Sequence, residues 1–593
     1  VGDEEVYDEK KLVGMGGQRF MHSSDDAEEE SRYADVRLAY DMFGRLVDCD
    51  GHDILRVALY SRVEDLGKCI VEHERDPIKF VQAMIQLKNK TDAVIKKGFR
   101  DDKTFTNRAT QAFEHFLNQN KRSSEYLSLY LDDYLRGNLN KANAIDMEMD
   151  NGQQQLKNNK NTEKNTTTTE IWKEVGRTTV VTTSDAAVDA CVQIFRFLRE
   201  KDYFEHFYQL HLSKRLLASK SVSDDSSERD VVSKLKLECG YQYAQKMEVM
   251  LNDVSLSKAI SRKFNELVEE GKRDGEARQK LVQSMNSQYI STADGGSSQQ
   301  KRLQTREPKM IMSNERFEDL TKNIELNVKV LTTGSWPLLK LSKVPFPKNL
   351  PSTCVDIQKL FVQHYEANYG ARRIAWRADC GTAELKVQFK SGEKLLVVST
   401  MQMCILEVFN DTEAVTLRQF AKILGVDIDS CAKALHGLAL AKNKTNVLIY
   451  TSVAGGATTA QQPATSGITT DSTQNVKILK DDVFMFNDNF QSKHYRVKIA
   501  TGSTAKKETI EEAKLTAESI REDRKPEIEA TIVRILKAKR KIEHNALIAE
   551  VTVALQNRFH CDPGETKRRI ERLIDLEYIA RDDKDRRIYR YLS

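Results

Sequence analysis

Residues 532–541 read IVRILKAKRK, and five of these ten residues are lysine or arginine. At 100° per residue, a helix here would gather its apolar side chains on one side, with Arg534, Lys537 and Lys541 facing away from them. Lys539 projects to the apolar side. A neutral, accessible lysine amine can attack a thioester when a partner enzyme supplies orientation and a base. Lys537 is therefore a candidate acceptor for a covalently attached group.

Two other interpretations of these charges remain open. A charged run on a helix is commonly a solvated face, which implies no function. Alternatively, the basic side of a later helix could enter a DNA major groove. Residues 521–593 hold 18 Lys plus Arg against 14 Asp plus Glu, and the rest of the chain holds 74 of each, so a partner of this segment should be acidic. The basic residues of the later helix are Lys567, Arg568, Arg569 and Arg572.

The helix that carries Lys537 is predicted to begin at Pro526. Proline suits the first turn of a helix, and Glu527 and Glu529 complement the dipole at that end. A helix of about 16 residues results. Its apolar side is predicted to consist of Ile528, Ile532, Ile535, Leu536 and Ile542.

Two further helices and a hairpin follow. One helix runs through ALIAEVTVAL at 546–555. The next opens with Asp562 as N-cap, Pro563 at the first helical position and Glu565 as the reciprocal cap. The turn DDKD then separates YIAR from RRIYRYL, as in a short β-hairpin. Residues 521–593 are therefore predicted to form a winged helix.

The remaining sequence is mostly helical in pattern. Apolar residues recur every three or four positions between 31 and 140 and again between 188 and 254, whereas shorter β-branched runs begin near 327. Polar segments poor in apolar residues interrupt these regions. A chain of 593 residues needs more than one hydrophobic core, so we expect several domains.

Signals for catalysis, cofactors and membranes are missing from the sequence. His206 and His211 lie five residues apart, whereas zinc-binding pairs on a helix lie four apart, so no metal site is assigned. No P-loop, dinucleotide fingerprint or G-x-S-x-G motif occurs. No apolar run approaches the roughly 18 residues that cross a bilayer. Nine cysteines without a C-x-x-C pair fit reduced thiols in the cytoplasm or nucleus. We expect a non-catalytic protein without a cofactor of its own.

Long blocks of the sequence resemble the cullin family. SSEYLSLYLDD (123–133) and SVSDDSSE (221–228) are most similar to the class of cullins that recruits BTB-domain adaptors. The resemblance covers about residues 33–593 apart from the polar inserts. Its main blocks are FYQLHLSKRLLASKSVSDDSSERDVVSKLKLECGYQYAQKMEVMLNDVSLS (207–257), LTTGSWP (331–337), VSTMQMCILEVFND (398–411) and DRKPEIEATIVRILKAKRKIEHNALIAEV (523–551).

The resemblance implies a scaffold of a multisubunit ubiquitin ligase. Such a scaffold brings adaptor-bound substrate to a ubiquitin-conjugating enzyme held by a RING-box protein, which leads to ubiquitin-dependent degradation. Zinc is expected only in the RING partner. Lys537 occupies the position that receives a ubiquitin-like modifier (neddylation), and Arg534 and Lys541 are assigned to docking the modifying machinery. Neither a membrane nor a nucleic acid is then an expected partner.

The RING partner is predicted to add a β-strand to an exposed sheet edge, where backbone pairing gives affinity with little demand on side chains. NVKVL (327–331) and ELKVQF (384–389) are the candidate edges. Either segment could instead be an ordinary core strand. The residues assigned to this contact are Val328, Val330, Leu385, Val387 and Phe389.

The resemblance also implies a mostly α architecture of helical repeat, four-helix bundle, α/β domain and winged helix. Residues 33–71 already match the segment that leads into the third repeat, so the chain is expected to be truncated at its N-terminus. The resemblance places the adaptor site in the first repeat, so we expect that site to be largely missing and assign it no residues. The expected division is an unplaced segment 1–30, helical repeat 31–147, linker 148–184, four-helix bundle 185–270, polar insert 271–307, α/β domain 308–500 with a winged-helix-like part near 396–450 and a disordered insert 454–475, and winged helix 521–593.

Overall fold

The computed structural model describes most of the chain between residues 23 and 592. The predicted linker 148–184, apart from Ser184, the insert 454–475 and most of the insert 271–307 lie outside the described residues. The described ranges are 23–45, 51–120, 122–137, 184–218, 225–276, 278–281, 315, 317–318, 324–337, 347–370, 372–440, 446–451, 478–499, 510–582 and 585–592.

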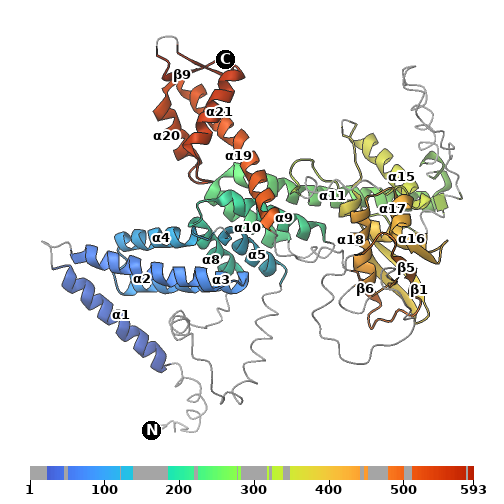
Figure 1. The fold of residues 1–593 in the computed structure, drawn as a ribbon, viewed down its shortest axis with the longest axis horizontal. Coiled ribbons are helices and arrows are strands. Elements are labelled where there is room, and N and C mark those ends of the chain that lie inside the picture. Colours follow the sequence, from blue (N-terminus) through green and yellow to red (C-terminus); the bar gives the residue numbers. More distant parts are fainter. Residues whose placement is uncertain are drawn as a thin grey trace, which may run out of the picture. The chain divides into compact units, whose positions relative to one another are not determined.

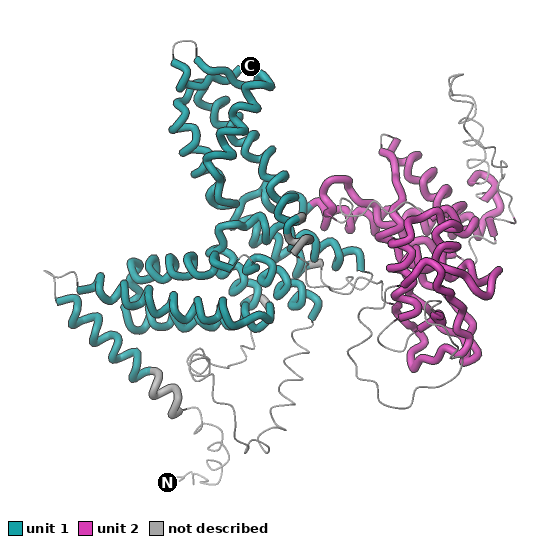
Figure 2. The backbone as a smooth tube through the Cα atoms, in the orientation of Figure 1, with its two compact units in different colours: residues 1–248, 514–593 teal, residues 249–513 magenta. Residues whose placement is uncertain are grey.

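Over these described residues the fold is mostly helical with three small sheets, which confirms the predicted fold class. The chain divides into two compact units (Figure 2). Unit 1 contains residues 1–248 and 514–593, so the two ends of the chain share one unit. Unit 2 contains residues 249–513.

Five helices open unit 1 (Figure 1). Asp76 and Asp102 cap two of them by accepting hydrogen bonds from backbone N–H groups two residues on. Buried phenylalanines, among them Phe105 and Phe116, fill the space between the helices. The helices are α1 (Ser23–Phe43), α2 (Gly51–His73), α3 (Pro77–Lys97), α4 (Lys103–Leu117) and α5 (Ser123–Leu135).

A second group of helices packs against α5. Its core includes a buried ion cluster in which Arg215 contacts Asp132 at 2.5 Å and Glu228 at 2.6 Å. Pairing makes burial of these charges tolerable. The helices are α8 (Ser184–Arg196), α9 (Lys201–Leu217), α10 (Asp225–Cys239) and α11 (Tyr241–Arg273), the last of which continues into unit 2.

The LTTGSWP segment is anchored on α11 within unit 2. The indole Nε1–H of Trp336 donates to Asp253 Oδ2 at 2.8 Å, and the Trp336 side chain is fully buried. The backbone N–H of Thr332 donates to the same carboxylate. Burial and a satisfied indole N–H explain a structural role for this tryptophan.

The first sheet of unit 2 follows α15 (Ser352–Asn368) and the short 3-10 helix η3 (Ala378–Cys380). It consists of β1 (Thr382–Phe389), β2 (Gly392–Ser399) and β6 (Arg496–Lys498), in the order β1-β2-β6. β1 pairs antiparallel with β2, and β2 pairs parallel with β6. Within the described residues, β1 therefore lies at the edge of this sheet.

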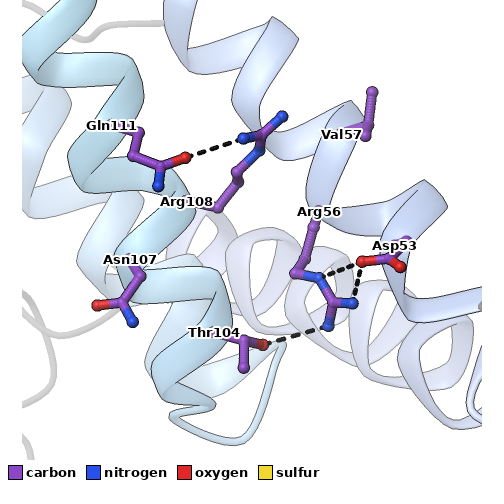
Figure 3. A pocket seen from close by; sticks show the side chains of 7 residues that line it. All are labelled: Asp53, Arg56, Val57, Thr104, Asn107, Arg108 and Gln111. Carbon is purple, nitrogen blue, oxygen red and sulfur yellow. Dashed lines mark hydrogen bonds and ion pairs between the residues drawn. The ribbon is translucent and has the colours of Figure 1, made fainter.

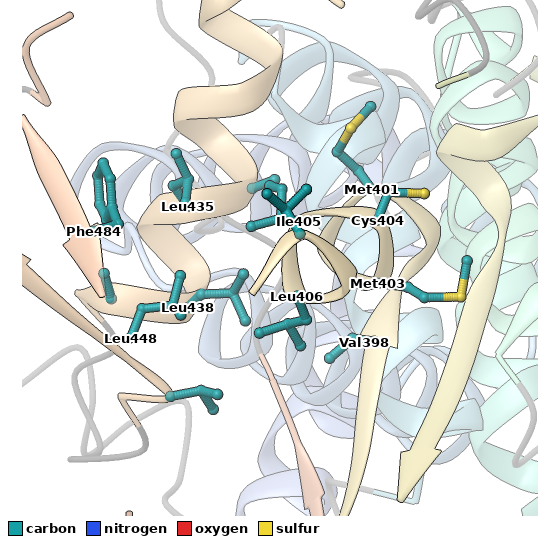
Figure 4. Close-up of a cluster of buried hydrophobic side chains, with 14 of the residues drawn as sticks. Val398, Met401, Met403, Cys404, Ile405, Leu406, Leu435, Leu438, Leu448 and Phe484 are labelled. Carbon is teal, nitrogen blue, oxygen red and sulfur yellow. The ribbon is translucent and has the colours of Figure 1, made fainter. Parts of the chain in front are cut away.

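A winged-helix arrangement occupies the rest of unit 2, around a core of buried aliphatic and aromatic side chains (Figure 4). Capping boxes at Ser399 and Thr416 start two of its helices. Its last strand lies well beyond the expected range 396–450. The elements are α16 (Thr400–Val408), β3 (Ala414–Thr416), α17 (Leu417–Leu424), α18 (Ile428–Ala439), β4 (Leu448–Thr451) and β5 (Val483–Phe486), with sheet order β3-β5-β4.

A second winged helix ends the chain, as the sequence predicted. Its sheet has the order β7-β9-β8, which matches the strand order of the first winged helix. Asp562 caps the third helix through Gly564 N–H. The elements are α19 (Ile510–Lys539), β7 (Lys541–Glu543), α20 (His544–Leu555), α21 (Pro563–Asp575), β8 (Ile579–Arg581) and β9 (Ile588–Tyr591).

The predicted start of the lysine-bearing helix is wrong. α19 has 30 residues, and Pro526 lies inside it. An interior proline removes one helical hydrogen bond, which costs about 3 kcal/mol. Ile520 and Ile528 are buried on either side of the proline, so packing offsets this cost. Ile542, expected on the same helix, instead belongs to β7.

Candidate modification site and its supporting contacts

Lys537 lies in the last turn of α19, two residues before the helix ends. Its side chain is exposed, whereas Ile532 and Leu536 on the opposite side are completely buried in the winged-helix core. The amine is thus carried by a helix that is packed firmly in place. This geometry suits an acceptor that a partner enzyme must reach.

The cations around Lys537 differ in the side chains with which they pair. Lys539 is 53% exposed and pairs with Glu550 of α20, so its projection onto the apolar side is wrong. Lys541 lies on β7, outside the helix, and its Nζ is 3.1 Å from Asp582. Arg534 is exposed and contacts Thr531 Oγ1 at 3.5 Å. Whether Arg534 and Lys541 dock the modifying machinery stays a prediction.

Two of the basic residues of α21, Arg569 and Arg572, join this helix to α19. Arg569 is only 14% exposed and lies 3.4 Å from Glu529 of α19. Arg572 approaches the same carboxylate at 3.6 Å, and Arg568 pairs with Glu565 at 3.1 Å. These pairs occupy three of the four cations that would contact DNA, which leaves the nucleic-acid interpretation with little support. Glu565, expected as a reciprocal cap, pairs with arginines instead.

The winged helix docks on α9 within unit 1 through residues that the sequence did not single out. Arg524 of α19 contacts Asp202 at 2.9 Å and stacks over the ring of Phe559 at 4.8 Å. Arg558, which follows α20, lies 3.6 Å from Glu205 and also pairs with Glu527. Nothing in local spacing predicts the contacts with Asp202 and Glu205, because they join positions more than 300 residues apart. We call this set of contacts the α9 junction.

A backbone hydrogen bond completes the α9 junction. The N–H of Lys201 donates to the carbonyl of Arg558 at 2.9 Å. The carbonyl of Lys201 in turn accepts from the hydroxyl of Tyr243 at 2.8 Å. The first turn of α9 is therefore fixed to both the winged helix and α11.

Burial changes the electrostatics of Glu205 at the α9 junction. Burial raises the pKa of Glu205 from 4.5 to about 7, against the opposing attraction of Arg558 and Lys246. Asp202 nearby raises it further. Glu205 therefore titrates close to neutral pH.

The two candidate RING-binding segments differ in structure. ELKVQF lies in the edge strand β1, where Leu385 and Val387 pack against the unit 2 core. Phe389 is buried and its ring stacks on that of Phe486 at a centroid distance of 5.5 Å. These three apolar side chains face the core, so along the open edge a partner strand would meet the backbone and the exposed side chains of Glu384, Lys386 and Gln388.

The other segment, NVKVL, is not a sheet strand within the described residues, so this expectation is wrong. It is extended along α11, whose serines occupy its backbone. Ser261 Oγ donates to the Val328 carbonyl at 2.8 Å, and the Val330 N–H donates to Ser257 Oγ at 2.8 Å. A helix supplies the hydrogen bonds that a neighbouring strand would otherwise provide.

The described residues contain no group of three or more His, Cys, Asp and Glu arranged to hold a metal ion. His211 instead lies 3.7 Å from Asp132 in the buried ion cluster. Burial lowers the pKa of His211 to about 4. None of the described helices is long and apolar enough to span a membrane.

A cavity of about 570 Å³ opens between α2 and α4 (Figure 3). Arg56 donates to Asp53 and Thr104, and Arg108 donates to Gln111. Because both arginines already bind other lining residues, we assign the cavity no function.

Comparisons with known proteins place these features in one family. The cullin alpha solenoid domain matches residues 9–261, the cullin alpha+beta domain residues 330–490 and the cullin protein neddylation domain residues 523–585. The first match begins inside the segment 1–30 that the sequence analysis left unplaced. The third contains Lys537. The chain belongs to the cullin family.

Within that family the chain is similar to cullin-3 proteins. It is 32% identical to Cullin-3A of Arabidopsis thaliana over 593 residues, 99% of this chain and 65% of that protein. It is 32% identical to Cullin-3 of Dictyostelium discoideum, over 95% of this chain and 63% of that protein, and 30% identical to Cullin-3 of Caenorhabditis elegans, over 98% and 64%. The chain thus spans slightly less than two thirds of the relatives it matches.

Proposed function

We propose that this chain is the scaffold subunit of a cullin-RING ubiquitin ligase whose activity is raised by a ubiquitin-like modifier attached to Lys537. The observation that carries the proposal is the exposed amine of Lys537 on an anchored helix inside the region that matches the neddylation domain. The scaffold lowers no chemical barrier itself. It holds a substrate lysine near a charged thioester and so raises its effective concentration.

The proposed partners follow from the same assignment. A zinc-binding RING-box protein recruits the ubiquitin-conjugating enzyme, and a BTB-domain adaptor brings the substrate for degradation. A separate conjugating enzyme delivers the modifier to Lys537. This chain needs no metal or cofactor of its own, and it works in the cytoplasm and nucleus.

The open edge of β1 is the proposed RING contact. A strand from the partner would pair with β1 along the side opposite β2, so that Leu385, Val387 and Phe389 act by holding the strand in place. Val328 and Val330 are also assigned to the contact, although Ser261 and Ser257 of α11 already hydrogen-bond the backbone at these two residues.

We expect modification of Lys537 to shift the equilibrium between a winged helix docked at the α9 junction and a released one. A protein-sized modifier on Lys537 can favour a released winged helix only if the docked and released states make different contacts. The contacts of Arg524 with Asp202 and of Arg558 with Glu205 join the winged helix to α9, so release of the winged helix would break them. Release would free the RING partner to approach substrate.

Reconstitution tests the proposal. The chain is co-expressed with a RING-box protein, purified, and incubated with the modifier, its charged conjugating enzyme and a ubiquitin-conjugating enzyme. We expect a single modified band and faster ubiquitin transfer after modification. A chain that binds no RING-box protein and accepts no modifier would not be such a scaffold.

A further inference from the structure

Three cations around Lys537 have no carboxylate partner within the described residues: Arg534, which contacts only the hydroxyl of Thr531, Lys537 itself and Arg540. Lys539 pairs with Glu550 and Lys541 pairs with Asp582, so carboxylates of the same winged helix neutralise both. In the part of the chain that the structure describes, the side chains of Lys537 and Arg540 have no such partner. Both side chains are exposed. Arg540 is therefore the cation nearest the acceptor, beyond the end of α19, that remains available to another molecule.

Arg540 also has a backbone conformation that its side chain disfavours. Its φ is +63°, in the left-handed region that costs non-glycine residues about 1 kcal/mol or more. Its N–H donates to Leu536 O at 2.7 Å, and its carbonyl accepts from Tyr591 N–H at 3.1 Å. Both hydrogen bonds hold the backbone of Arg540 in this conformation. Helix α17 ends with the same conformation but uses Gly425. An unfavourable residue held rigidly beside a reactive group points to a role in function.

We propose that Arg540 binds an acidic side chain on the enzyme that delivers the modifier to Lys537, and so docks that enzyme over the acceptor amine. The inference rests on the proposed function. The guanidinium offers a planar, permanently charged donor for a carboxylate, and its fixed backbone reduces the entropy lost on binding. The structure therefore assigns to Arg540 the docking role that the sequence gave to Lys541, whose charge Asp582 already occupies.

Single-turnover transfer measures this role. The full chain with its RING partner is mixed with increasing amounts of the charged conjugating enzyme, and modified Lys537 is followed by gel and mass spectrometry. We expect Arg540→Gly to raise the half-saturating enzyme concentration about tenfold, since one charge-assisted contact is lost. The maximal rate should change less than twofold. Arg540→Glu should be slower still, and Arg540→Lys should keep most of the activity.

A matched control exists on the same winged helix. Glu577 ends α21 with φ +60°, so Glu577→Gly relieves the same kind of backbone strain away from the acceptor helix. Both glycine variants should melt at or above the temperature of the unsubstituted chain. Only Arg540→Gly should slow transfer. Conjugating enzyme that carries no modifier should also inhibit transfer to Arg540→Gly about tenfold less well than it inhibits transfer to the unsubstituted chain.

Two results separate this inference from the proposed function. Modified product that persists in Lys537→Arg would contradict the proposed function. Product that disappears in Lys537→Arg while Arg540→Gly keeps its half-saturation and competition values would overturn only the role of Arg540. Equal slowing in Glu577→Gly would also overturn it, because backbone strain rather than charge would then explain the effect.

Discussion

The guanidinium of Arg558 lies 3.6 Å from the carboxylate of Glu205, although 352 residues separate the two in the sequence. Both side chains are at most 15% exposed. The pair joins α9 to the end of α20 and thereby docks the winged helix that carries Lys537. Because Glu205 is buried and titrates near neutrality, docking should depend on pH.

Glu205→Gln is expected to stabilise unit 1 at neutral and alkaline pH. The folded pKa of Glu205 is about 7 and the unfolded value is 4.5, so the folded state binds more protons between these values. The contribution of Glu205 is therefore fully present below pH 4.5 and declines as pH rises to 7. The variant's advantage in unfolding free energy should rise from near zero at pH 4.5 to about 3 kcal/mol above pH 7.5.

Urea unfolding of Glu205→Gln and of the unsubstituted chain at pH 4.5, 6 and 8 measures this difference in unfolding free energy. Glu200→Gln is the control, because its carboxylate is 49% exposed and should change stability by less than about 0.5 kcal/mol. Arg558 keeps Glu527 as a partner in the variant. A variant less stable than the unsubstituted chain at pH 8 would mean that the Arg558 attraction outweighs burial.

Arg524→Ala should loosen the docking of the winged helix. The arginine is 20% exposed, and its loss leaves Asp202 without this partner and Phe559 without a stacked cation. We expect the free energy that holds the winged helix on α9 to fall by about 2 kcal/mol. Hydrogen exchange of the Lys201 amide, which donates to Arg558, should quicken accordingly.

Arg568→Ala is the matched control for this change. Arg568 is 67% exposed and contacts Glu565 and the carbonyl of Gly564 within its own helix, so its loss should leave Lys201 exchange unchanged. Equal exchange in both variants would show that Arg524 does not hold the α9 junction.

Val387→Pro should abolish co-purification of the RING-box protein while the helices of unit 1 stay folded. Proline removes a backbone donor from the edge strand β1 and distorts the pairing that an added strand requires. Co-expression followed by affinity purification measures binding, and circular dichroism measures the helices.

Lys386→Ala is the control for Val387→Pro, because it changes an exposed side chain on the same strand and leaves the backbone intact. Binding should change less than about twofold if backbone pairing dominates. Unchanged binding in Val387→Pro would place the RING contact elsewhere, and a large loss in Lys386→Ala would indicate recognition of side chains.

Local sequence signals predicted the C-terminal winged helix well. Asp562 and Pro563 begin α21 as expected, because capping depends on residues that are neighbours in the sequence. The amphipathic pattern likewise placed Ile532 and Leu536 in the core and Lys537 outside it. These features depend on helical period alone.

Features that depend on distant contacts were not predictable. Pro526 signals a helix start locally, but buried Ile520 and Ile528 carry the helix through it. Lys541 continues the basic run in sequence, yet the left-handed turn at Arg540 moves it onto β7. NVKVL has the composition of a strand, but α11 supplies its hydrogen bonds. Glu205 and Arg558 have no local pattern that joins them.

Lys537→Arg is the most direct test of the proposed scaffold. The substitution keeps a positive charge and removes the nucleophilic amine. With the RING-box protein, modifier and both conjugating enzymes present, the modified band should vanish and substrate ubiquitination should fall to the unmodified rate, while RING binding stays unchanged. Lys539→Arg is the control and should be modified normally. A modified band that persists in Lys537→Arg would contradict the assignment of this lysine as the acceptor.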